Sequence, residues 1–180
     1  MATRKIVSPS GAAAKSAGEA APKKAVDVPA LITQLARTTD NARMNKALDM
    51  LRAERFQLFT ELNDDHLTGV VKSQTNSSLF YACKIDKNGN FMCCTQNLVR
   101  CGGLGKSLPC KHLLVLMVGL AKSGGADATV LSGWAKNVSS SKLKIDKDAM
   151  SATFIKYKGA EAGEIDWRPT ETIPEDYYAL

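Results

Sequence analysis

The feature of this sequence that most constrains its fold is a cluster of cysteine and histidine residues between positions 93 and 112. The stretch CCTQNLVRCGGLGKSLPCKH holds four of the five cysteines and one of the two histidines in a chain of 180 residues. Thiols and imidazoles gathered in so short a segment serve one of three chemistries: a disulfide, a reactive thiol or a metal site. Each of these makes a different demand on the rest of the chain.

A disulfide agrees least with the rest of the chain. The N-terminus has early basic residues but no apolar segment after them, as a secretory signal would have. We therefore expect a cytoplasmic location, where reducing conditions disfavour disulfides, and the odd number of cysteines agrees with this. The longest apolar run, residues 113–121, is about half as long as the roughly 18 residues that a membrane-spanning helix needs, so we expect no membrane association.

A reactive thiol would need a histidine base within reach and a third residue to orient that base. Cys110 could pair with His112 or with the distant His66, but no Asn or Asp stands out as the orienting residue. His66 follows two aspartates and precedes a predicted strand, which is typical of a surface loop residue. We therefore predict that the protein is not an enzyme and has no catalytic residue.

A metal site accounts for the cluster most simply. Cys110 and His112 stand at the start of an apolar segment that predicts a helix. A helix N-terminus favours the thiolate form of cysteine and turns both donors toward one point. Zinc takes four sulfur and nitrogen ligands in a tetrahedron, whereas an iron–sulfur cluster suits the histidine less well. The sequence therefore predicts structural Zn2+ as the cofactor.

The surrounding sequence predicts an α+β fold: a small antiparallel three-stranded sheet with a zinc-bound loop and helix, flanked by N- and C-terminal helices. Asp27 and Asp40 are expected to cap the first two helices. Residues 1–24 are rich in Ala, Ser, Gly, Pro and Lys and predict a disordered basic tail. Four segments follow it: a helical N-terminal segment 25–62, a zinc-finger unit 63–124, a helical C-terminal segment 125–160 and an acidic extended tail 161–180.

An Asn-Gly pair at positions 88–89 predicts a β-hairpin within the zinc-finger unit. With a loop of either two or four residues, Cys83 on the first strand would face Cys94 on the second. In that register Cys94 lies on the face that packs against the helix, and Cys93 points away from it.

The order of these elements resembles that of the SWIM zinc finger. The resemblance rests on the strands GVV, FYACKI and FMCC, a variable loop, and CKHLL at the start of a helix, within about residues 66–123. The family pattern is Cys-x-Cys, a loop, then Cys-x-His. Cys110 and His112 match its second half, whereas the first half departs from it because this chain has no Cys-x-Cys.

The first two ligands must therefore be chosen from the residues themselves. Cys94 ends its strand on the face turned toward the helix, and Cys101 precedes two glycines in a loop that can fold back. Cys83 is predicted to be a core residue, and its closeness to Cys94 keeps it as a reserve ligand. With Cys93 as the alternative first ligand, we predict the ligand set Cys94, Cys101, Cys110 and His112.

A closed zinc site with four protein ligands performs no chemistry, so the function is expected on the surface that the metal organises. The resemblance implies a binding module, with either a protein or DNA as its partner. Among proteins it implies an AAA-type ATPase or a von Willebrand A-domain protein. We expect a protein-interaction or adaptor module.

The charge distribution leaves DNA binding as the alternative. Residues 25–160 carry a net charge of +7, whereas the last twenty residues carry −5. The basic residues of the middle segment are scattered, and few aromatic side chains are placed to stack on bases. The pattern therefore permits nucleic-acid binding but favours a protein partner.

Overall fold

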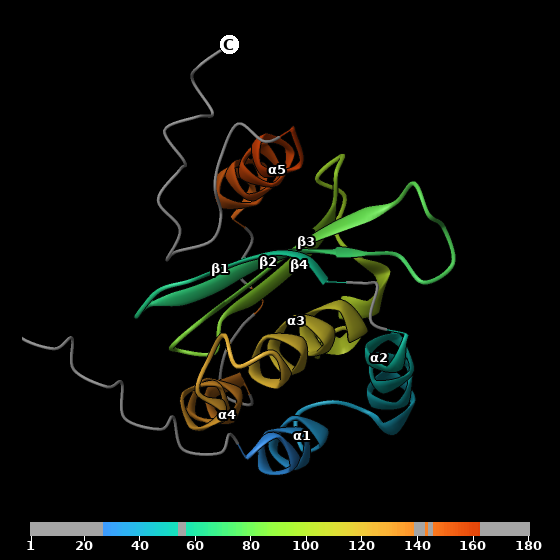
Figure 1. Ribbon diagram of the computed structural model, residues 1–180. Coiled ribbons are helices and arrows are strands. Elements are labelled where there is room, and N and C mark those ends of the chain that lie inside the picture. Colours follow the sequence, from blue (N-terminus) through green and yellow to red (C-terminus); the bar gives the residue numbers. More distant parts are fainter. Residues whose placement is uncertain (1–26, 54–56, 139–142, 144–145, 163–180) are drawn as a thin grey trace, which may run out of the picture.

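A computed structural model describes residues 27–53, 57–138, 143 and 146–162, and the predicted α+β class is confirmed. A four-stranded antiparallel sheet crosses the middle of the molecule (Figure 1). Helices α1 to α4 cover one face of this sheet, and α5 covers the other. The predicted basic tail, and all but the first two residues of the predicted acidic tail, lie outside the described residues.

The helices begin where capping residues satisfy their first backbone N–H groups. The Asp27 carboxylate accepts from the backbone N–H of Ala30 at 3.0 Å, and the Asp40 carboxylate accepts from that of Arg43 at 2.8 Å, which confirms both predicted caps. The described helices are α1 (Val28–Ala36), α2 (Asn41–Arg52), the 3-10 helix η1 (Gly102–Ser107), α3 (Lys111–Lys122), α4 (Ala128–Asn137) and α5 (Lys147–Ala162).

The sheet has one strand more than predicted, and its order follows the chain. The additional strand lies inside segment 25–62, which was predicted to be helical: α2 ends at Arg52, and residues 57–62 pair with β2. A sequence such as QLFTEL has no strong preference of its own, so pairing with β2 decides its structure. The strands are β1 (Gln57–Leu62), β2 (His66–Lys72), β3 (Phe80–Asp86) and β4 (Phe91–Thr95).

The β3–β4 hairpin has the predicted turn but a different register. The backbone N–H of Asp86 donates to the carbonyl of Asn90 at 2.9 Å, which leaves a three-residue loop whose final glycine has a φ of 80°. Cys83 consequently pairs with Cys93. The predicted pairing of Cys83 with Cys94 is wrong, because a shift of one residue turns every side chain of a strand to the opposite face.

Helix α3 is the centre of the larger hydrophobic core. Leu114 and Leu116 are fully buried, and the helix contacts the sheet on one side and α1, α2 and α4 on the other. On the opposite face of the sheet, Met150 and Tyr157 of α5 pack on β2, β3 and β4. Among the described residues, no helix has both the length and the apolar character required to cross a membrane.

Candidate metal centre

Four buried donors meet between strand β4 and the start of helix α3. The sulfur atoms of Cys93, Cys101 and Cys110 and a ring nitrogen of His112 all lie within 4.8 Å of one another. Cys93 comes from the face of β4 that is turned toward α3, Cys101 from the loop after β4, Cys110 from the N-cap of α3, and His112 from its first turn. Such a group can hold a metal ion.

The backbone around the site explains how the loop returns to the strand. The N–H of Cys101 donates to the carbonyl of Cys93 at 2.9 Å, so the loop closes back on β4. A Cβ added at Gly103 would lie 2.9 Å from the Cβ of Cys110 and 3.4 Å from the sulfur of Cys101. A side chain at this position would therefore force the two cysteines apart, and glycine lets them approach.

The distances agree with tetrahedral coordination. The Nδ1 atom of His112 lies 3.8 Å from the sulfur of Cys93, 3.5 Å from that of Cys101 and 3.9 Å from that of Cys110. A zinc ion with Zn–S bonds of about 2.3 Å and Zn–N bonds of about 2.0–2.1 Å separates such atoms by about 3.6 Å. The donors are therefore spaced for an ion of this size without rearrangement of the backbone.

The electrostatics of the site also favour a bound cation. Burial raises the pKa of the Cys93 and Cys110 thiols well above the ordinary value. Hydrogen bonds from these thiols lower the pKa of Cys101, first from Cys110 and then from Cys93. Two of the three thiols are therefore disfavoured as thiolates by burial, whereas the third is favoured as a thiolate by its hydrogen bonds. A divalent metal is the kind of group that would let all three ionise, since metal ligands bind in the deprotonated form.

Two residues of β3 support the centre from the side of the sheet. The ring of Tyr81 stacks on that of His112, with centroids 3.8 Å apart and an angle of 17° between the planes. The sulfur of Cys83 lies 3.6 Å from that of Cys93. Tyr81 thus holds the imidazole plane, and Cys83 places a fourth thiol beside the three thiols and one imidazole of the group. The buried Nε2 atom of His112 has no hydrogen-bond partner in the part of the chain that the structure describes.

The predicted ligands are brought together with one exception. Cys101, Cys110 and His112 converge as expected, but the predicted first ligand, Cys94, is not part of the group, and the alternative Cys93 takes its place. The three-residue hairpin loop is the reason, because it reverses the faces of Cys93 and Cys94. Cys83 is buried in the core as predicted and remains outside the four-donor group.

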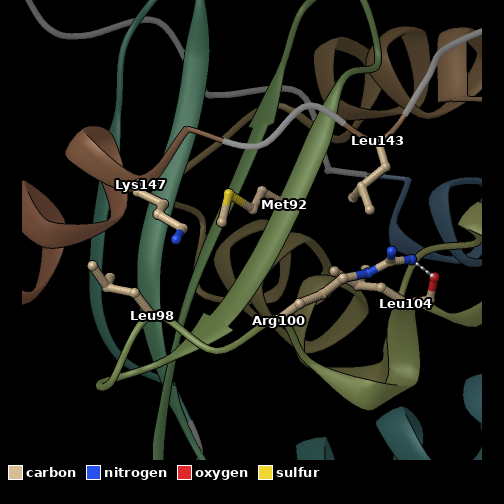
Figure 2. Close-up of a pocket in the computed structure, with 6 residues that line it drawn as sticks. All are labelled: Met92, Leu98, Arg100, Leu104, Leu143 and Lys147. Atoms are coloured by element: carbon tan, nitrogen blue, oxygen red, sulfur yellow. Dashed lines mark hydrogen bonds between the residues drawn. The ribbon is translucent and has the colours of Figure 1, made fainter.

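On the opposite face of β4, Cys94 lies in a hydrophobic cluster with Ala82, Met92 and Met150. Burial raises the pKa of its thiol to about 11. Beside this cluster is a pocket of about 220 Å3. Its lining, shown in Figure 2, consists of Met92, Leu98, Arg100, Leu104, Leu143 and Lys147.

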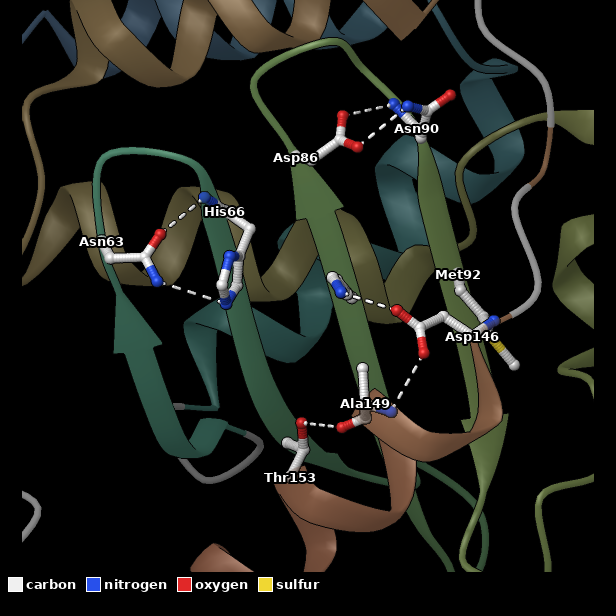
Figure 3. A network of polar contacts seen from close by, with 9 residues as sticks. Asn63, His66, Asp86, Asn90, Met92, Asp146, Ala149 and Thr153 are labelled. Atoms are coloured by element: carbon white, nitrogen blue, oxygen red, sulfur yellow. Dashed lines mark hydrogen bonds and ion pairs between the residues drawn. The ribbon is translucent and has the colours of Figure 1, made fainter.

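A polar network fastens the start of α5 next to this pocket (Figure 3). The Asp146 carboxylate accepts from the Nζ of Lys84 at 2.8 Å and from the N–H of Ala149 at 3.0 Å, while its own N–H donates to the sulfur of Met92 at 3.1 Å. Farther along the sheet, His66 begins β2, and its backbone N–H donates to the side-chain Oδ1 of Asn63 at 2.8 Å. His66 is thus a residue of the β1–β2 turn region with no part in the four-donor group.

Sequence reasoning missed Cys93 as the preferred ligand and missed Tyr81 altogether. A three-residue loop around the Asn-Gly pair would have identified Cys93, since it pairs Cys83 with Cys93 and turns Cys93 toward α3. Nothing in the sequence pointed to Tyr81, because its stacking on His112 depends on how α3 lies across β3.

Comparisons with known proteins give no match to this chain, whether with protein-family models, with curated proteins or with solved structures. The function has to be inferred from the geometry of the chain itself.

Proposed function

We propose that this protein is a zinc-binding module whose metal is structural and which acts as a protein-interaction or adaptor subunit. The observation that carries the proposal is the convergence of three thiols and one imidazole inside the core. Four protein donors complete a tetrahedron and leave no position for a substrate, which is typical of structural rather than catalytic zinc. The donor set is Cys93, Cys101, Cys110 and His112.

The proposed metal joins three parts of the chain that also meet in the larger hydrophobic core. It would tie the end of β4 to the loop before η1 and to the first turn of α3. The loop has only a short 3-10 helix of its own, and a metal bound by Cys101 would add to the backbone bond between Cys101 and Cys93 and to the burial of Leu104. Binding free energy at such a site is folding free energy, because the unfolded chain has no preformed site.

The SWIM resemblance supports this proposal in outline. The chain has a β-hairpin followed by Cys-x-His at the start of an apolar helix, as that family pattern requires. We propose that the Cys-x-Cys half is replaced by Cys93 and Cys101, which lie on either side of a loop whose ends are hydrogen-bonded. The resemblance then suggests a cytoplasmic AAA-type ATPase or von Willebrand A-domain protein as the partner.

Metal content tests the proposal directly. Purified protein is expected to contain one zinc per chain, and the cobalt-substituted form should show absorption bands of three thiolates and one imidazole in a tetrahedral site. Cys110→Ala and His112→Ala should lose the metal and unfold the hairpin and α3. A wild-type protein without metal, or a metal-free variant of equal stability, would overturn the proposal.

Nucleic-acid binding is the second candidate, and one observation favours it. Lys46 of α2 and Lys111 of α3 lie near each other, and burial together with the charge of Lys46 lowers the pKa of Lys111. A pair of cations can contact phosphates. Affinity for a DNA duplex should then fall steeply with salt concentration, whereas docking of a protein through apolar contacts should depend on salt only weakly.

A further inference from the structure

The pocket on the Cys94 side of the sheet has the chemistry of a binding site. Four apolar side chains line it, and two cationic side chains, Arg100 and Lys147, approach it from opposite sides of Met92 (Figure 2). Its volume of about 220 Å3 is below the roughly 300–1,000 Å3 of pockets that hold whole small molecules. The pocket is therefore suited to one large apolar side chain rather than to a complete cofactor.

The two cations have no acidic partner within the described residues. Arg100 donates to the backbone carbonyl of Leu104 at 2.7 Å, and Lys147 takes part in none of the ion pairs of the described chain. The nearby carboxylate of Asp146 is already bound to Lys84. Both positive charges are thus available to a ligand, and their placement beside apolar walls is complementary to an acidic segment that carries an apolar residue.

The pocket wall contains a strained residue. Leu98 has a φ of 57°, in the left-handed region, which glycine adopts readily and leucine rarely does. Such strain persists where the surrounding structure fixes the residue, and here the backbone N–H of Leu98 donates to the carbonyl of Thr95 at 2.8 Å. The side chain of Leu98 lines the pocket, and the adjacent Val99 is 62% exposed, so the apolar surface continues beyond the pocket.

The same loop joins this pocket to the metal centre. Leu98 and Arg100 stand just before Cys101, and Leu104 follows it on η1. Arg100 forms an isolated antiparallel β-bridge with Cys94, so the end of the loop after β4 pairs with β4 itself. Whatever holds Cys101 in place therefore also holds three of the residues that line the pocket.

We propose that this pocket is the docking site for a partner peptide that is acidic and inserts one large apolar side chain. The apolar residue occupies the space between Met92, Leu98 and Leu104, and flanking Asp or Glu residues pair with Arg100 and Lys147. This inference rests on the proposed protein-interaction function and adds the chemistry of the partner. It also assigns the docking surface to the face of β4 that the metal does not occupy.

Fluorescence anisotropy with short peptides tests this. The probes are fluorescein-labelled Asp-Glu-X-Glu-Asp peptides in which X is Leu, Phe, Trp or Ala, together with versions in which Lys replaces every acid. The Leu, Phe or Trp peptide should bind at least tenfold more tightly than the Ala peptide, and the Lys versions should not bind. The inference is wrong if no apolar peptide binds up to about 1 mM, or if the Ala peptide binds as well.

Two variants locate the binding site. Lys147→Glu should weaken binding at least tenfold without loss of stability, because an acid suits the first turn of α5. Lys46→Glu makes the same charge change on an exposed residue of α2 and is the matched control, expected to leave binding unchanged. Equal weakening by both variants would indicate attraction by net charge alone and would overturn the assignment.

The variant Leu98→Gly distinguishes an effect on peptide binding from an effect on the stability of the whole protein. It removes one apolar wall but also removes the strain of a positive φ, so binding should fall while thermal stability changes little. Unchanged binding would contradict the pocket as the site. Zinc content is measured on the same samples, so a loaded protein that binds no peptide refutes this inference alone, whereas a metal-free protein refutes the proposed function.

Discussion

Cys93 and Cys94 are neighbours in the chain, yet their thiols belong to different parts of the molecule. The sulfur of Cys93 lies among other thiols and the imidazole of His112, whereas Cys94 is packed among Ala82, Met92 and Met150. Both are completely buried, so burial does not distinguish them. The difference comes from the alternation of a β-strand, and it shows that strand register, rather than position in a motif, decides which thiol can bind a metal.

The two faces of the sheet differ in the same way as these two cysteines. Four helices lie on the Cys93 face, and the four donors are buried between β4, the loop after it and the start of α3. Among the described helices, α5 covers the Cys94 face. A pocket lies beside its first residue, Lys147. We infer that the Cys93 face stabilises the loop after β4, and that the Cys94 face presents the same loop to a partner.

Replacing Cys93 or Cys94 by alanine should give the largest difference in zinc content and stability between the two faces of the sheet. Cys93→Ala removes one of the proposed metal ligands, and structural zinc sites contribute about 10–16 kcal/mol in isolated fingers, as much as the whole stability of a typical domain. We expect it to lose zinc and fail to fold cooperatively. Cys94→Ala should retain one zinc and lose about 1 kcal/mol, as most substitutions do. Zinc content and chemical denaturation of both variants measure this.

The opposite result would identify the predicted ligand as the true one. If Cys94→Ala lost the metal and Cys93→Ala kept it, the hairpin of the folded protein would have the register first expected from the sequence, and the structural assignment of the centre would fail.

How far the sequence predicted the fold depends on whether local chemistry decided each feature. The caps Asp27 and Asp40, the helix that begins after Cys110 and the Asn-Gly turn were all predictable, because each depends on neighbouring residues. Strand β1 was not, since its structure comes from pairing with β2.

The candidate site shows the same limit. Three of the four donors could be identified from spacing and from their place at a helix start. The fourth depended on a loop length of three rather than two or four residues, which the residues of the turn do not decide by themselves. The stacking of Tyr81 and the pocket around Leu98 arise from tertiary packing and could not be predicted.

Replacing Cys83, on the same face of the sheet as Cys93, should have an intermediate effect, and that effect should be on zinc affinity. Its thiol lies 3.6 Å from the sulfur of Cys93 and can donate a hydrogen bond to that thiolate. Removing a residue that supports a metal ligand usually lowers affinity by about 10–100-fold. We expect such a loss for Cys83→Ala in competition with a chromophoric chelator, and a smaller loss for Cys83→Ser, which keeps a donor.

The cobalt spectrum distinguishes this supporting role from direct ligation. Cys83→Ala should retain the bands of three thiolates. A loss of one thiolate band in this variant would show that Cys83 is itself a ligand, and the comparison of β3 with β4 would have to be revised.

On the Cys94 face of the sheet, breaking the contact between β3 and α5 should lower the stability by a smaller amount and leave zinc binding unchanged. Asp146 caps α5 and pairs with Lys84, and both side chains are partly buried. The loss of an N-cap costs about 0.5–2 kcal/mol, so we expect Asp146→Ala to lower the free energy of unfolding by roughly this amount. Asp146→Asn, which keeps a capping oxygen, should lose less. A change in zinc affinity in either variant would contradict the separation of the faces.

The smallest effect at neutral pH is expected at Tyr157, also on the α5 face. Burial, and then its hydrogen bond to Glu161 at 2.9 Å, raises the pKa of Tyr157 to about 12. The unfolded chain releases this proton near the ordinary value of about 10, whereas the folded protein still holds it. Stability from the neutral phenol is therefore complete below about pH 10 and is lost as the pH rises toward 12.

Tyr157→Phe should cost about 0.5–1.5 kcal/mol at pH 7 through the lost hydrogen bond. Denaturation at pH 9 and pH 11 should show a shallower loss of stability for Tyr157→Phe than for the wild type, and parallel losses would show that the phenol titrates alike in both states.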